Sequence, residues 1–448
     1  MKSFDVRGTR IYIDERNGNF SICEEEILNA PSFEIEESPA YSHDLYKSVA
    51  FCLEISDACN LRCSYCFNAD KSGRRMDEKT AVGCLEGLFL EFPNAEKYSI
   101  DVSGDGEPLL NLKLIDAIAD YAKRKSDEID REVTVSLVTN GTLLIEPISQ
   151  HLQRKGVLFG VSLDGNKINH DRYRMDECGN GTFDLVLKNV QAIKHREHVG
   201  CAVTIARDVF PLFETILELK KTFKTISVKP VRSKEFGIDE KSLAPWVEEY
   251  ERLEAKLEEE LSKGDASTLF CLLNGDDYFG KFILRCFLSL KALSRCDAGT
   301  GRIAISIDGE YFPCPAMMGG NHRIGNLAEG FNTLEARKLY SRQTERENCA
   351  SCPFVYECGG ECAVEFDANS GNNHWMCLFK QKLILLAMLL EERCRAFPNC
   401  VYQEIVDFCL RKLGRSEEKT ALREFRNLHQ ELTFTEAKEF FDKENPEY

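Results

Sequence analysis

Apolar and polar residues alternate along the first half of the chain in a pattern that predicts regular secondary structure. Between about residues 50 and 232, short β-branched apolar runs are separated by longer stretches of helical periodicity. The apolar runs predict six strands, at 50–57, 98–104, 133–141, 158–165, 199–206 and 225–231. The stretches between them predict five helices, at 78–91, 111–127, 145–155, 183–197 and 209–223.

This alternation of strand and helix indicates parallel strands with right-handed crossovers. Two α/β architectures stay open, a doubly wound sheet and a complete or partial (β/α) barrel. Both build their active sites at the carboxyl ends of the strands. Unusual motifs follow four of the predicted strands: CNLRCSYC, GDGEP, TNG and SLDG. We therefore expect these four motifs to meet in one site.

The regions outside the alternating unit differ from it in composition. The first 48 residues contain two short apolar runs joined by Asn17-Gly18, which is typical of a β-hairpin and indicates an edge extension or a docking element. The charged helix predicted at 244–264 is interpreted as a solvated connector. The following Cys-, Gly- and Pro-rich segment predicts a small module held together by metal. The five expected parts are 1–48, 49–235, a helical bridge at 236–285, the Cys-rich domain at 286–378 and a helical tail at 379–448.

Length and charge narrow the class of protein. The 448 residues exceed the roughly 250–300 at which a single core stops growing, so several domains are expected. A formal charge of −17 argues against nucleic acid as a partner, because such binding needs basic side chains. The longest uncharged apolar run, at 383–390, is shorter than the roughly 20 residues that cross a bilayer. With no apolar signal core at the start, these features predict a cytoplasmic protein without a membrane partner.

Twenty cysteines are unusual in a chain expected in the reducing cytosol, so metal binding is the first hypothesis. Three of them, Cys59, Cys63 and Cys66, lie within eight residues. A structural zinc site usually takes four protein ligands. Three thiolates suit a [4Fe–4S] cluster better, because they can hold three irons and leave the fourth to a small molecule.

The motif Cys59-x3-Cys63-x2-Cys66, with Tyr65 before the last cysteine, resembles the signature of the radical S-adenosylmethionine (SAM) superfamily. The resemblance implies a partial (β/α)6 barrel in which this cluster binds SAM and cleaves it reductively to a 5′-deoxyadenosyl radical. The segment 103–110 is similar to the family's Gly-Gly-Glu segment. That similarity implies SAM contacts from residues after the second to fourth strands: Gly104, Gly106 and Glu107 at the amino group, Ser162 at the ribose, and also Asn140 and Arg174. Asn140-Gly141 and Asp164-Gly165 could instead be plain turns.

A second cysteine series follows the alternating unit. It reads Cys296-x12-Gly309-x4-Cys314, then Cys349-x2-Cys352-x5-Cys358-x3-Cys362, then Cys377. The series resembles the SPASM extension of radical SAM enzymes that modify peptides, which holds two auxiliary [4Fe–4S] clusters and would bring the total to three. The resemblance implies Cys296, Cys314 and Cys362 for the first auxiliary cluster, and Cys349, Cys352, Cys358 and Cys377 for the second. The structural alternative for this module is a set of zinc ribbons.

The fourth ligand of the first auxiliary cluster is left open by the series. Cys286 is the nearest spare thiol, but it lies in an apolar helical pattern where buried, inert cysteines are common. A substrate thiolate is the alternative. The remaining nine cysteines have no ligand spacing and are interpreted as structural.

The resemblance implies a maturase that forms an oxidative thioether or carbon–carbon cross-link in a ribosomally made precursor peptide. Reduced flavodoxin or ferredoxin would supply electrons, and residues 1–48 would bind the leader as an added strand. Sulfatase maturases of this family carry an aspartate where this chain has Pro315, which argues against the sulfatase-maturase alternative. An iron–sulfur protein that only relays electrons is the hypothesis from another class.

Overall fold

The structure is a computed structural model. It describes residues 2–13, 20–23, 48–68, 71–288 except 195 and 234, 290, 296–332 except 319 and 320, 335–336, 349, 351–360, 362, 364, 374–397 and 399–412.

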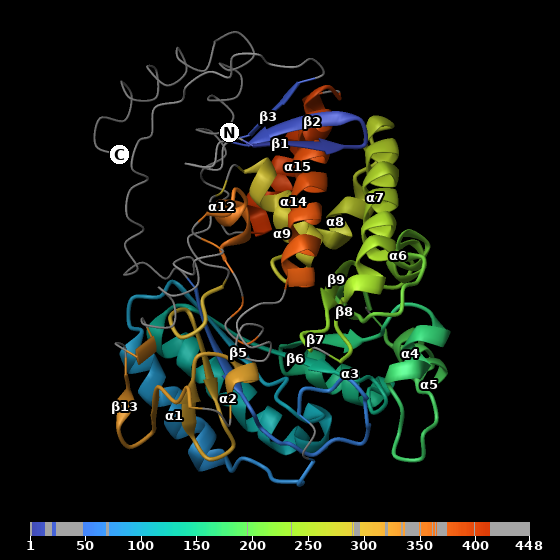
Figure 1. The fold of residues 1–448 in the computed structure, drawn as a ribbon. Coiled ribbons are helices and arrows are strands. Elements are labelled where there is room, and N and C mark those ends of the chain that lie inside the picture. The colour runs from blue at the N-terminus through green and yellow to red at the C-terminus, as the bar shows by residue number, and fades with distance from the viewer. Residues whose placement is uncertain are drawn as a thin grey trace, which may run out of the picture.

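Six parallel strands form the centre of the molecule (Figure 1). They pair in chain order, as expected when each strand is followed by a crossover helix. The strands are β4 (Ser48–Leu53), β5 (Lys97–Asp101), β6 (Glu132–Thr139), β7 (Val157–Ser162), β8 (Gly200–Ile205) and β9 (Thr225–Pro230). The predicted α/β fold with a six-stranded parallel unit is confirmed.

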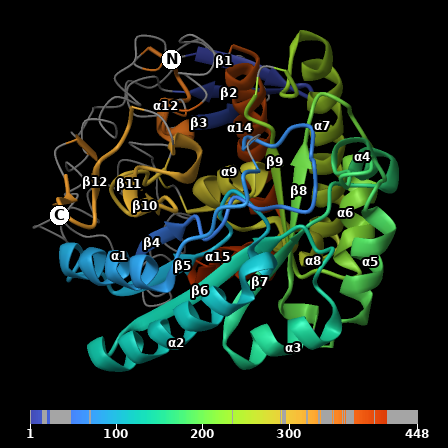
Figure 2. The same cartoon turned by 90° about the horizontal axis from the view of Figure 1, so that it is seen from below.

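Amphipathic helices cover the outside of these strands. Figure 2 shows α1 (Glu78–Glu91), α2 (Leu112–Ile129) and α3 (Glu146–Arg154) in a row along the sheet. The other helices of this unit are α4 (Lys167–Tyr173), α5 (Phe183–Ala192) and α6 (Leu212–Lys220), with 3-10 turns at η1 (Pro108–Asn111) and η2 (Arg196–His198). Local chemistry fixes their ends: Asp77 caps α1 by accepting from the Thr80 amide, and α2 ends at Asp130 in the left-handed conformation.

The Cys-rich segment continues the same sheet. Its strand β10 (Arg302–Ile305) pairs in parallel with β4, and Ile305 lies opposite Leu53. Three antiparallel strands complete a ten-stranded sheet, namely β11 (Glu310–Phe312), β12 (Gly325–Asn326) and β13 (Gly330–Phe331). The segment that carries Cys314 is thus attached to the strand that precedes the first cysteine motif.

A helical layer lies beside the sheet. Its members are α7 (Glu240–Ser262), α8 (Ser267–Leu272), α9 (Tyr278–Phe287), α12 (Val355–Cys358), α14 (His374–Arg395) and α15 (Asn399–Lys412). The interpretation of 244–264 as a solvated connector is wrong, because α7 buries Trp246 and Tyr250 on one face. The Tyr250 ring lies 5.4 Å from that of Phe379 on α14. Most glutamates of this helix are exposed or half-buried, and Glu254 alone among them is buried.

The amino-terminal strands form a separate antiparallel sheet of β1 (Lys2–Val6), β2 (Thr9–Ile13) and β3 (Phe20–Cys23). The predicted hairpin corresponds to β2 and β3, and its Asn17-Gly18 turn lies outside the described residues. Figure 1 shows this sheet beside α14 and α7. Arg7 forms an ion pair with the buried Glu254 of α7. None of the described helices combines the length and the apolarity needed to cross a bilayer.

Candidate functional site

The loop that follows β4 carries Cys59, Cys63 and Cys66, and each of these residues is partly buried. The Leu61 amide donates to Cys59 Sγ over 3.5 Å. Lys71 donates to Cys66 Sγ over 3.4 Å and to the carbonyl oxygen of Asp105 over 2.8 Å. Donors aimed at sulfur stabilise thiolate, which is the form that binds metal.

Burial, together with the smaller effects of the nearby Cys66 and Cys59, raises the pKa of Cys63 to about 11. Desolvation likewise raises the pKa of Cys59. Cys59 and Cys63 therefore resist ionisation in this desolvated loop unless a cation joins them. They therefore fit an iron–sulfur cluster, whose binding would release their protons.

The described residues contain no group of three His, Cys, Asp or Glu side chains arranged around a single metal ion. A cubane differs from a single ion because each thiolate binds a different iron. A cluster site therefore does not require the three sulfurs to surround one point.

The GDGEP segment is packed directly against the cysteine loop. A Cβ on Gly106 would lie 2.3 Å from the carbonyl oxygen of Ala58 and 2.6 Å from that of Ser56, so no larger residue fits. The Glu107 amide donates to the Ala58 carbonyl oxygen over 2.7 Å. Gly104 has a φ of +58°, a conformation that glycine adopts without strain. These contacts fix the backbone just before Cys59.

Glu107 lies at the junction of the β5 and β6 loops and is 1% exposed. Its carboxylate accepts from the Thr139 hydroxyl at 2.6 Å, the Asn140 amide at 2.8 Å and the Leu109 amide at 3.1 Å. Burial raises its pKa, while these hydrogen bonds act in the opposite direction. Glu107, which was predicted to contact SAM, thus joins the loops after β5 and β6 by hydrogen bonds.

Asn140 contacts the first cysteine motif directly. Its side-chain amide donates to Cys59 Sγ over 3.9 Å and to Asn60 Oδ1 over 2.9 Å. Its own Oδ1 accepts from the amide of Thr142. The TNG motif therefore forms a turn, which was the alternative to a SAM contact, and it also contacts the cysteine loop.

The residues after β7 form a buried polar network. Arg174 donates to Asp164 over 2.7 Å, the Tyr65 hydroxyl donates to the same carboxylate, and the Arg174 guanidinium lies 5.5 Å from the centre of the Tyr65 ring. Arg174 acts to lower the pKa of Cys63, against the dominant effect of burial. Ser162, 8% exposed, ends β7 beside this network.

His170 supports this network as a neutral imidazole, because burial lowers its pKa to about 4. Its Nδ1 accepts from the Asp164 amide at 3.2 Å, and its Nε2 donates to the Thr182 hydroxyl oxygen at 3.1 Å. These contacts fix the turn that carries Asp164.

Sequence reasoning missed Asp164 as the partner of Arg174 and Lys71 as a contact of Cys66. It also missed an acidic pair beside the glycine segment. Burial and the neighbouring carboxylate of Glu54 together raise the pKa of Asp105 to about 8. The signal was the Asp inside GDGEP, although its partner at the end of β4 required the fold.

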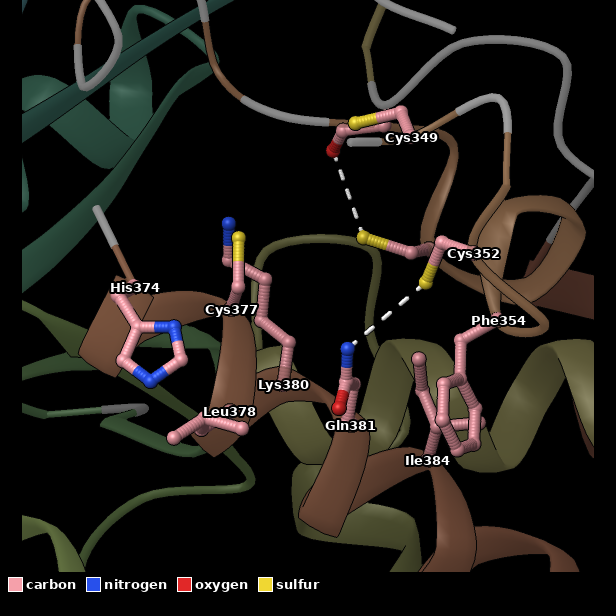
Figure 3. A pocket seen from close by; sticks show the side chains of 11 residues that line it. Cys349, Cys352, Phe354, His374, Cys377, Leu378, Lys380, Gln381 and Ile384 are labelled. Atoms are coloured by element: carbon pink, nitrogen blue, oxygen red, sulfur yellow. Dashed lines mark hydrogen bonds between the residues drawn. The ribbon is translucent and has the colours of Figure 1, made fainter. Parts of the chain in front are cut away.

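The second auxiliary set lines one cavity of about 260 Å³. Figure 3 shows Cys377, Lys380 and Gln381 projecting from α14 toward the loop of Cys349 and Cys352. The Gln381 amide donates to Cys352 Sγ over 3.7 Å, and the Cys352 amide donates to the carbonyl oxygen of Cys349 over 3.0 Å. Cys358 completes the predicted four.

The first auxiliary set lines a neighbouring cavity of about 430 Å³, which contains Cys296, Cys314 and Cys362 on its wall. Burial, together with the smaller effects of the nearby Cys362 and Cys296, raises the pKa of Cys314 to about 12. Cys286 does not line either cavity; it is 6% exposed on α9 within the apolar core. Phe67, the residue after Cys66, lines the far wall of the larger cavity, which thus extends to the cysteine loop.

The other cysteines described with their side chains are mostly in the core. Cys178 is exposed, and the rest are buried: Cys52, Cys84, Cys201, Cys271, Cys394 and Cys409. The side chains of Cys23 and Cys400 lie outside the described residues.

Three relatives are similar to this chain over much of their length. An uncharacterised protein of Methanocaldococcus jannaschii is 30% identical over 208 residues, which cover 46% of this chain and 70% of the relative. The radical SAM cyclopropyl synthase TigE of Paramaledivibacter caminithermalis is 24% identical, over 72% of this chain and 70% of that protein. A cysteine-type anaerobic sulfatase-maturating enzyme of Clostridium novyi is 24% identical, over 71% of this chain and 88% of that enzyme.

Among solved structures, anSMEcpe with bound AdoMet and Cp18Cys peptide has a similar fold. The TM-score is 0.60 at 20% identity, over 78% of this chain and 99% of that one. Residues 53–226 match the family profile described as Radical SAM superfamily. This match covers the three-cysteine loop and β5 to β8, and it includes only the last residue of β4 and the first two residues of β9. The chain belongs to the radical SAM superfamily, and it groups there with SPASM-type enzymes, as its cysteine spacing predicts.

Proposed function

We propose that this radical SAM enzyme oxidises a residue of a ribosomally made precursor peptide and closes a thioether or carbon–carbon cross-link. The observation that carries the proposal is the 430 Å³ cavity. It reaches from Phe67, beside the last cysteine of the SAM-cluster loop, to the thiols of the first auxiliary set. A residue of a peptide in this cavity would have the radical source on one side and an electron acceptor on the other.

The chain's own residues would prepare this site. Cys59, Cys63 and Cys66 would hold the cluster that binds SAM. The cluster and SAM together would supply a 5′-deoxyadenosyl radical. Glu107 and Asn140 hold the adjoining loops in place, and Asp164 orients Arg174. A peptide bound in the cavity would cover the apolar side chain of Phe67, which is 66% exposed, and would thereby remove water from this wall. Exclusion of water protects a radical from side reactions.

The similarity to a sulfatase-maturating enzyme supports a peptide or protein substrate. Pro315 favours the peptide cross-link over sulfatase maturation. It starts the 3-10 turn η3 (Pro315–Met317) directly after Cys314 and has no carboxylate to act as a base at that position. We also propose reduced flavodoxin or ferredoxin as the electron source, and the edge of the β1–β3 sheet as the site where a leader adds a strand.

The test is anaerobic reconstitution with iron and sulfide, followed by SAM and dithionite. We expect 5′-deoxyadenosine from the wild type and none from Cys63→Ala, with Cys178→Ala as the matched control because Cys178 is exposed and outside all three sets. Co-expression with a candidate precursor should then give a peptide lighter by two hydrogens. Wild-type protein that yields no nucleoside would exclude the enzyme and leave the electron-transfer hypothesis.

A further inference from the structure

The two auxiliary cavities share a wall. Of the described residues, Cys358 and Lys380 line both of them. Cys358 belongs to the second predicted ligand set, so a shared thiol is expected where the two sets adjoin. Lys380 belongs to neither set.

Lys380 is placed by α14. It follows Cys377 by three residues, a spacing that brings two side chains to the same face of a helix. Only 2% of its surface is exposed. Figure 3 shows its side chain extending in the same direction as that of Cys377, toward the cavity. A lysine at such a buried position is uncommon, because desolvation disfavours its charge unless negative charge is close.

Helix α9 contributes two more basic side chains near Cys358. Lys281 lines the larger cavity, and burial lowers its pKa to about 8, while Cys296 and Cys358 act to raise it. Arg285, one turn later, donates to the carbonyl oxygens of Glu357 and Cys358. Glu357, 3% exposed, is a carboxylate close to Arg285. Three basic side chains, Lys281, Arg285 and Lys380, therefore lie near Cys358, with the carboxylate of Glu357 beside Arg285.

A cubane with four thiolates carries about two net negative charges when oxidised and one more when reduced. A nearby fixed cation stabilises the reduced form more, and this raises the reduction potential. A cation on the common wall acts on both clusters. A higher potential makes either cluster a better acceptor for the one electron that an oxidised substrate radical must lose.

We propose that Lys380 is a positioning residue shared by the two auxiliary clusters, holding both reduction potentials above the values that they would have without its charge. This inference rests on the two auxiliary clusters of the proposed function. It does not rest on the identity of the peptide.

The experiment is an EPR-monitored redox titration of the reconstituted full-length chain without peptide. The SAM-binding cluster is recognised by the change of its signal when SAM is added, which leaves the two auxiliary signals. Lys380→Met keeps the length of the side chain and removes its charge. Gln381→Leu removes a hydrogen bond to Cys352 only, and Lys382→Met changes an exposed lysine of the same helix.

We expect Lys380→Met to shift both auxiliary potentials to more negative values, Gln381→Leu to shift only one, and Lys382→Met to shift neither. Lys380→Arg, which restores the charge, should keep both potentials close to the wild type. Should Lys380→Met lose iron, the comparison is made with Lys380→Gln. Unchanged potentials in a fully loaded Lys380 variant, or a shift of one cluster alone, would overturn the inference. The titration needs no turnover, so a failure to modify any peptide would count against the proposed function and leave this result standing.

Discussion

The carboxylate of Glu107 accepts a hydrogen bond from the backbone amide of Asn140 at 2.8 Å. This contact joins the loops after β5 and β6, and Asn140 in turn reaches Cys59 with its side chain. The acid therefore acts on the cysteine loop through its neighbour.

Replacement of Glu107 tests whether its hydrogen bonds stabilise the two loops. Glu107→Gln places an NH2 group opposite a backbone or hydroxyl donor, and we expect the free energy of unfolding of the iron-free chain to fall by about 1–3 kcal/mol. Denaturant unfolding measures the change. Glu128→Gln on the outside of α2 is the control and should stay within about 0.5 kcal/mol of the wild type. Equal stability of the two variants would contradict the role of Glu107.

Gly106 tests the close approach of the two loops. Gly106→Ala would place a carbon 2.3 Å from the Ala58 carbonyl oxygen, so the backbone before Cys59 must move. We expect the variant to lose about four of the roughly twelve irons that three cubanes would hold. In Gly87→Ala the new Cβ meets nothing closer than 3.5 Å, and this helix variant should bind iron normally. Full iron content in Gly106→Ala would refute the argument.

The role of Cys286 is decided by iron content as well. Because Cys286 lies in the core of α9 and away from both cavity walls, we expect Cys286→Ala to retain the wild-type iron and sulfide content. Cys352→Ala, in contrast, should lose about four irons. If Cys286→Ala lost the same amount, Cys286 would be the missing ligand of the first auxiliary cluster.

Glu254 predicts a specific dependence of stability on pH. Burial raises its pKa from 4.5 to about 7, while Arg7 acts to lower it. Between these values the folded chain holds a proton that the unfolded chain has lost. The resulting stabilisation is complete below pH 4.5 and is lost as the pH rises through 7.

The wild type should therefore lose roughly 3 kcal/mol of stability relative to Glu254→Gln between pH 4.5 and 8. Unfolding of both proteins across this range measures the difference. Glu259→Gln is the control, because paired lysines lower the pKa of Glu259 to about 2 and its charge is constant here. Parallel curves for wild type and Glu254→Gln would contradict the prediction.

Local patterns predicted the elements of the fold well. The six parallel strands and their helices depend on short-range periodicity, and α1 was predicted with the bounds that the structure has. The error at α7 has a physical reason. Most of its glutamates lie outside the buried face, while Trp246 and Tyr250 are spaced one turn apart on that face, which also contains Glu254. The high content of charged residues in α7 made its amphipathic periodicity difficult to recognise from the sequence.

Long-range contacts could not be predicted in the same way. The cysteine spacing grouped Cys349 and Cys352 correctly as neighbours, because the chain itself keeps them close. The pairing of Arg174 with Asp164 and the position of Lys380 between two cavities arise from tertiary packing. Cys377 was expected in the Cys-rich domain and Lys380 in the helical tail, so the sequence did not indicate that α14 carries both.

The pairing of β10 with β4 has a consequence for synthesis of the chain. Leu53 and Ile305 are translated far apart, so one border of the nascent parallel sheet keeps its amide and carbonyl groups unpaired until the ribosome has passed residue 305. Exposed borders of this kind promote aggregation, and distant pairing is slow. Chains cut short before this strand should accumulate as insoluble protein, and slower elongation upstream should lower the yield of correctly folded enzyme.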